Sequence, residues 1–122
     1  IPSAGKLLGK VAGYANISID STDAKEPMFK IEYFNFTDDG EYVLNGSERR
    51  NLESSKDIFS RNSRWDADIK VSGKHTGFLK AEDVRFYATK IGSGKIKAAL
   101  DKYKVDVDLA KGLPTGVEGQ LR

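Results

Sequence analysis

Apolar and polar residues alternate with a period of two along most of this chain, which is the pattern of β-strands with one buried face. The clearest case is 64–73, where Trp65, Ala67, Ile69 and Val71 alternate with charged or polar neighbours. Similar short segments, separated by turn residues, recur at intervals of 8 to 12 residues. The pattern predicts an all-β protein, an antiparallel β-sandwich or flattened barrel of about 8–9 short strands, and not alternating β and α units. The strands expected outside 64–73 lie within 10–19, 29–46, 78–91, 95–101 and 104–109.

The segment 29–46 predicts a hairpin. Phe29, Ile31 and Tyr33 share one parity, whereas the next aromatic residues have the other. Either this strand is buried on both faces or a bulge near 33–34 returns the later aromatics to the core. The sequence Thr-Asp-Asp-Gly at 37–40 is turn chemistry and predicts a positive φ at Gly40. The following Asn-Gly at 45–46 fits either a second tight turn or a bulge in a continuing strand.

Four segments are less regular. The charged stretch 47–52 suits only an edge or solvent-facing strand. Residues 53–63 fit a loop or a single capped helical turn. Gly-Ser-Gly at 92–94 predicts a turn, and 93–103 fits a strand better than an amphipathic helix.

Length and composition are those of one globular domain. The 122 residues are enough to bury a core without disulfides, and the chain has no cysteine. Twenty basic and 18 acidic residues are mixed along the sequence, which gives no basic footprint for nucleic acid. No apolar run is long enough for membrane insertion. We expect a lead-in at 1–9, a single β domain at 10–111, and a tail or linker at 112–122.

Three of the asparagines begin glycosylation sequons, at Asn16, Asn35 and Asn45. Together with a first residue, Ile1, that is not methionine, they predict a secreted or extracellular protein. The alternative is that these three sequons arise only because asparagine and hydroxyl residues are frequent in turns and at strand edges.

Sequence motifs for catalysis are missing. The chain has no phosphate-binding glycine loop, nucleophile elbow or metalloprotease helix. The single histidine, His75, is expected in a turn. Asp66 and Asp68, or the aspartates at 38–39, form the pairs that a glycosidase would need, but carboxylates also keep an exposed sheet face solvated. The pattern therefore predicts no enzyme, no cofactor and no metal.

Aromatic rings on a sheet face are the more informative candidates, because they stack on sugar rings. Trp65 shares the apolar parity and is expected in the core. Tyr14 and Tyr87 have the opposite parity and are expected to be exposed. With Arg85 and Asn16 they form the predicted ligand-binding set.

Three short stretches and three single residues carry a resemblance: 13–16, 34–40 and 44–48, and Trp65 with the glycines at 73 and 77. Over 9–83 the chain resembles β-rich accessory modules appended to secreted microbial hydrolases or propeller proteins. The resemblance implies a non-catalytic module that engages a glycan or a neighbouring domain through an exposed sheet face. A small β-barrel carrier of an apolar ligand is the alternative, and a glycan-active enzyme using carboxylates is third.

Overall fold

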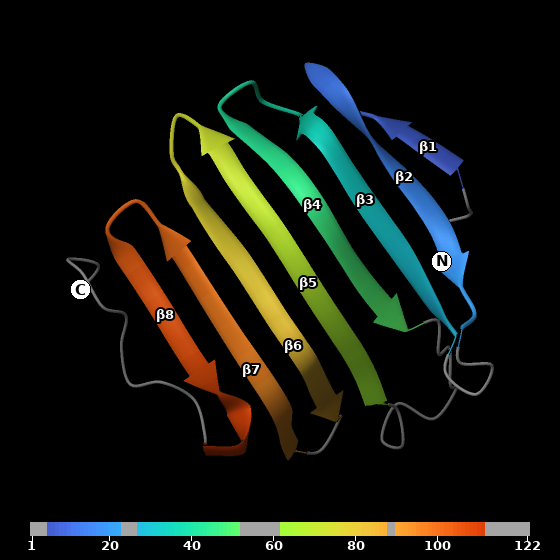
Figure 1. The fold of residues 1–122 in the computed structure, drawn as a ribbon, viewed down its shortest axis with the longest axis vertical. Coiled ribbons are helices and arrows are strands. Elements are labelled where there is room, and N and C mark those ends of the chain that lie inside the picture. The colour runs from blue at the N-terminus through green and yellow to red at the C-terminus, as the bar shows by residue number, and fades with distance from the viewer. Residues whose placement is uncertain (1–4, 23–26, 52–61, 88–89, 112–122) are drawn as a thin grey trace.

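Eight antiparallel strands form one open sheet in which each strand lies beside its neighbours in the sequence (Figure 1). The computed structural model describes residues 5–22, 27–51, 62–87 and 90–111. This arrangement confirms the predicted all-β antiparallel class and the number of strands. The sheet is not closed into a barrel, and the described residues form no second sheet. The elements are β1 (Gly5–Leu8), β2 (Ala12–Asp20), β3 (Met28–Thr37), β4 (Tyr42–Asn51), β5 (Asn62–Gly73), β6 (Gly77–Tyr87), β7 (Lys90–Leu100), β8 (Tyr103–Asp108) and the 3₁₀ helix η1 (Leu109–Lys111).

The two faces of the sheet differ in chemistry. Because directly paired residues of neighbouring strands point to the same side, the register assigns each side chain to a face. We call one side the apolar face. Its members include Ala15, Ile17, Ile19, Phe29, Ile31, Tyr33, Phe36, Leu44, Trp65, Ala67, Ile69, Val71, Leu79, Ala81, Val84, Phe86, Ile96, Ala98, Leu100, Val105 and Val107.

The opposite side is the charged face. It carries a basic side chain on every strand from β3 to β8 and acidic side chains on β3, β5, β6 and β8, which is the composition that keeps a sheet face in contact with water. Its charged members include Lys30, Glu32, Arg49, Arg64, Asp66, Asp68, Lys70, Lys80, Glu82, Arg85, Lys95, Lys97, Lys104, Asp106 and Asp108.

The core lies on the apolar face of β5 to β8. Val84 is fully buried, and Ala81 and Leu109 are almost so. Their neighbours across the strands, including Trp65 and Leu79, pack against them while staying partly exposed. The short helix η1 contributes Leu109 and so covers part of this end of the sheet. The buried cluster is small because, among the described residues, only η1 and the neighbouring side chains of the same face cover it.

The β3–β4 hairpin contains a bulge, which was one of the two alternatives for this strand, but Phe34 stays on the charged face beside Tyr14. The register shifts between Tyr33 and Phe36, and Asn35 has a φ of 47°. Asn45 fixes this bulge: its Oδ1 accepts the backbone N–H of Asn35 at 3.0 Å, and its Nδ2 donates to Asn35 Oδ1 at 2.9 Å. The bulge returns Phe36 to the apolar face opposite Leu44. At the turn, Gly40 has the predicted positive φ, at 76°.

The expectation that 47–52 forms an edge or solvent-facing strand is wrong. Asn45 and Gly46 make no second turn, and β4 continues to Asn51 as a central strand between β3 and β5. Glu48 on this strand is only 6% exposed. Burial is tolerated because its carboxylate has two hydrogen-bonding partners, described below. Charge along the sequence was therefore a misleading indicator of an edge.

Two other boundaries differ from the sequence prediction. The glycines at 92–94 lie within β7 and form no turn, because the chain reverses before Lys90. Within 1–9, residues Gly5–Leu8 pair with β2 as β1. The 93–103 segment is a strand up to Leu100, which agrees with the prediction of a strand in preference to an amphipathic helix. Most of 53–63, where a loop and a helical turn were alternatives, and all of 112–122 lie outside the described residues.

Candidate functional site

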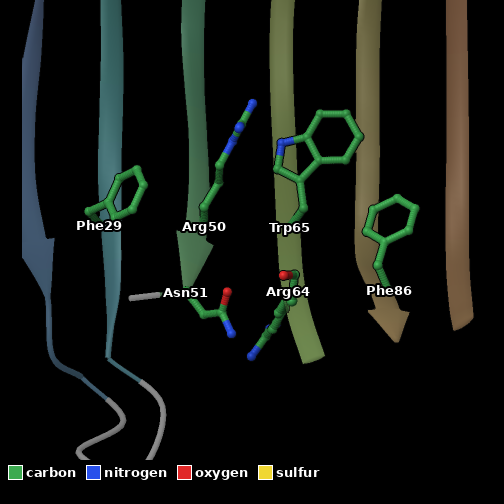
Figure 2. A pocket seen from close by; sticks show the side chains of 7 residues that line it. Phe29, Arg50, Asn51, Arg64, Trp65 and Phe86 are labelled. Atoms are coloured by element: carbon green, nitrogen blue, oxygen red, sulfur yellow. The ribbon is translucent and has the colours of Figure 1, made fainter. Parts of the chain in front are cut away.

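A shallow open hollow of about 350 Å³ lies at one end of the apolar face (Figure 2). The register explains its composition. Phe29 of β3 is opposite Arg50 of β4, and Arg50 is opposite Trp65 of β5. Phe86 of β6 completes the row and is 45% exposed. Figure 2 shows these four side chains rising from four adjacent strands. The polar residues Asn51, Ser63 and Arg64 line the rest of the hollow.

Trp65 forms one wall of the hollow. Its ring packs against the buried cluster, as its parity predicted, but it is half-buried because the hollow opens beside it. The guanidinium carbon of Arg50 lies 6.0 Å from the ring centroid, at the outer limit of a cation–π contact. The buried indole Nε1 has no hydrogen-bond partner among the described residues. A ligand seated here would meet the exposed part of the Trp65 ring, while the buried Nε1 stays out of its reach.

A buried acid links the hollow to the centre of the sheet. Glu48 Oε1 accepts from Arg50 Nε at 2.7 Å, and Glu48 Oε2 accepts the Tyr33 hydroxyl at 2.7 Å. Burial of the phenol, followed by its hydrogen bond to this carboxylate, raises the pKa of Tyr33. Sequence reasoning missed Glu48. The sequence could have indicated its position, because Glu48 lies two residues after Gly46 and four after Leu44 and so shares the apolar face with Leu44.

Tyr14, Asn16 and Arg85 map to the charged face, and the four predicted ligand-binding residues form two groups by strand. Tyr14 and Asn16 lie on β2, whereas Arg85 and Tyr87 lie on β6. Three strands separate the groups, a distance of roughly 19 Å at the usual strand spacing. The structure therefore does not bring the four residues into one site.

Within these groups the local contacts are clear. Tyr14 is half-buried and stacks on Phe34 with 4.9 Å between ring centroids, and Lys6 Nζ lies 4.1 Å from the Tyr14 ring. Asn16 is exposed. Arg85 Nε lies 3.2 Å from an Asp83 carboxylate oxygen. The side chain of Tyr87 lies outside the described part of the chain. Binding by either group stays a prediction.

Three of the candidate acids, Asp38, Asp39 and Asp66, have hydrogen-bond partners in the fold. Asp66 Oδ1 accepts the backbone N–H of Asp83 at 2.7 Å, and its Oδ2 lies 3.3 Å from Arg64 Nε and 3.7 Å from Arg49 Nη2. Asp39 accepts backbone N–H groups of the β3–β4 turn. Asp68 is exposed on the charged face. Among the described residues, no group of three or more His, Cys, Asp or Glu side chains is placed to hold a metal ion.

His75 lies in the β5–β6 turn as predicted, with a partner that the sequence did not reveal. Its Nδ1 lies 2.5 Å from Asp101 Oδ2, in the β7–β8 turn. Asp101 Oδ1 also accepts the backbone N–H of Thr76, and the His75 ring stacks on Tyr42. The hydrogen bond from His75, and then that from Thr76, lowers the pKa of Asp101. These contacts clamp two turns at one end of the sheet.

This clamp predicts acid sensitivity. Asp101 has a lower pKa in the folded state than its unfolded value of 3.8, so its contribution to stability is present above that value and is lost as the pH falls through the folded pKa. We expect Asp101→Asn and His75→Ala each to weaken the fall in melting temperature between pH 4 and pH 2, measured by circular dichroism. The double variant should weaken it no further. Additive effects of the two substitutions would contradict a shared clamp.

Comparison with known proteins adds no relative, since no family model, curated protein or solved structure matches this chain. Among the described residues, no helix is long and apolar enough to cross a membrane.

Proposed function

We propose that this chain is a non-catalytic accessory or binding module of a secreted protein, and that it docks on a macromolecular partner through the apolar face of its sheet. One observation carries the proposal. The described residues place an extensive set of apolar side chains on one face of an eight-stranded sheet and supply no second layer over it. A sheet with one apolar face gains stability by burying that face against another element.

The hollow beside Trp65 is the expected centre of contact. Trp, Arg and other aromatic residues supply most of the binding energy in protein interfaces, mainly from concave, desolvated positions. Trp65, Phe86 and Arg50 meet at this hollow. A glycan is the alternative ligand, because the half-buried Trp65 ring offers a stacking surface at the hollow. The mainly apolar face around the hollow favours a protein surface over a sugar.

Carriage of a small apolar molecule is less well supported. A carrier surrounds its ligand with protein, and ligand pockets bury most of the ligand surface. The described sheet is open at both edges, β1 and β8, and its hollow is shallow.

Exposure of the apolar face can be tested with the only tryptophan of the chain. At about 0.1 μM, well below the micromolar affinities of weak complexes, iodide should quench Trp65 emission and the dye ANS should bind. Phe86→Glu, on the apolar face, should reduce ANS binding several-fold. Phe78→Glu is the matched control, because Phe78 lies on the same strand but on the charged face and is similarly exposed, at 37%. No ANS binding and no quenching by iodide in a chain that light scattering shows to be monomeric would show that the chain covers its own face, and the proposal would then be wrong.

The proposal that the module is non-catalytic has a separate test. A screen of glycoside and ester substrates should show no turnover above that of a buffer control. Reproducible hydrolysis that disappears in Asp66→Asn or Asp68→Asn would contradict it. A glycan array run in parallel would detect sugar binding, and loss of that binding in Trp65→Ala with the fold intact would identify the hollow as a sugar site.

A further inference from the structure

We propose that the partner of the apolar face is a second copy of this chain, so that two sheets pack face to face as a homodimeric β-sandwich. This inference rests on the proposed docking role of the apolar face and names its occupant. The second sheet that the alternation of the sequence predicts would then come from the other copy.

The size of the face suits a dimer interface. Eight strands at about 4.8 Å spacing, with a mean length of about 30 Å, span roughly 1,000 Å² on one side. A stable protein–protein interface buries about 800 Å² on each partner. The face of one sheet is therefore sufficient, and a second copy offers a face of equal area.

Charge also favours self-association through this face. Among the described positions of the apolar face, the charged residues are Glu48 and Arg50, and these two are paired at 2.7 Å. Two copies can therefore meet without bringing uncompensated like charges together. The charged face has lysine or arginine on every strand from β3 to β8, with acidic residues among them, so contact between two copies there would remove many charged groups from water.

Shape supports the same partner. Two sheets pack about 10 Å apart when their twists match, with strands aligned to within about 30°. A second copy has the same twist by construction. It also presents the same mixture of large side chains, such as Phe29 and Trp65, and small ones, such as Ala67 and Ala81, which suits interdigitation across a sandwich.

The experiment compares mass with surface exposure for the intact chain. Size-exclusion chromatography with light scattering at about 50 μM, a concentration at which micromolar dimers are populated, should give twice the monomer mass of 13.5 kDa. Phe86→Glu should raise the dimer dissociation constant at least tenfold. Phe78→Glu, on the charged face of the same strand, should leave it unchanged. Ile19→Glu, also on the apolar face and 49% exposed, repeats the test on β2 should Phe86→Glu fail to fold by circular dichroism.

The outcomes separate this inference from the proposed function. A monomer at 50 μM that binds ANS would overturn the second copy as occupant, and the docking role would then require a different protein. A monomer that neither binds ANS nor shows Trp65 quenching would overturn both, and would implicate cover by the chain's own residues. A dimer that Phe78→Glu dissociates and Phe86→Glu preserves would place the interface on the charged face and contradict the inference.

Discussion

Replacing Gly46 with valine should destabilise the domain by at least about 3 kcal/mol, because two independent costs coincide at this position. Gly46 has a φ of 113°, a backbone conformation that a β-branched residue rarely adopts. A Cβ atom there would also lie 2.1 Å from the backbone oxygen of Asp68, across the β4–β5 pairing. Neither backbone can move away without breaking hydrogen bonds between two central strands. Chemical denaturation followed by circular dichroism measures the loss.

Gly40→Val is the matched control for this prediction. Gly40 also has a positive φ, at 76°, but a Cβ there meets only the Val11 side chain, at 3.6 Å. Backbone strain is then the main cost, and we expect about 1–2 kcal/mol. Equal losses in the two variants would show that backbone overlap at Gly46 contributes little.

These two glycines show what sequence could predict of the hairpin. The turn at 37–40 could be predicted because Asp-Asp-Gly is a typical turn sequence, and the positive φ of Gly40 confirms it. Asn-Gly at 45–46 is an equally typical turn sequence, yet it lies within β4. The difference arises from tertiary pairing: Gly46 is opposite Ile69 of β5, and Asn45 is used to fix the bulge at Asn35. Local preference does not contain that information.

The class of fold followed from alternation, whereas the number of layers did not. Alternation reports that each strand has one apolar side, and it says nothing of what lies against that side. A sandwich, a barrel and an open sheet therefore share the same pattern. The open arrangement among the described residues explains why apolar residues such as Ile19 and Phe86 stay about half exposed.

The candidate site was predictable only in part. Parity correctly placed Trp65 on the apolar face, but it could not show that Phe29, Arg50 and Phe86 gather around it, because that row depends on the register of four strands. The same limit explains why the predicted set of Tyr14, Asn16, Arg85 and Tyr87 does not form one site. Shared parity assigned these residues to one kind of surface, and strand order then separated them.

Burial of Glu48 has the clearest energetic consequence of this register. The Tyr33 hydroxyl and the Arg50 guanidinium satisfy a carboxylate that is 6% exposed. Removing a partner from a buried acceptor costs more than a hydrogen bond contributes on average, since the acceptor loses water without compensation. The pairing therefore ties β3 to β4 through side chains as well as through the backbone.

Tyr33→Phe should accordingly lower the free energy of unfolding at pH 7 by about 1–3 kcal/mol, because it leaves Glu48 Oε2 without the hydroxyl. Denaturant titration measures this loss, and Tyr42→Phe on the neighbouring strand is the control.

Tyr33→Phe should also change how the free energy of unfolding depends on pH above pH 10. Burial and the Glu48 carboxylate raise the pKa of Tyr33 above its ordinary value of 10.0, so the unfolded chain loses this proton first. The stability that Tyr33 contributes is therefore complete below pH 10 and declines above it, by at most about 1.4 kcal/mol per pH unit. Tyr33→Phe should flatten this decline, whereas Tyr42→Phe should retain it. An unchanged alkaline slope in Tyr33→Phe, together with wild-type stability at pH 7, would show that the hydroxyl does not bond the buried carboxylate in solution.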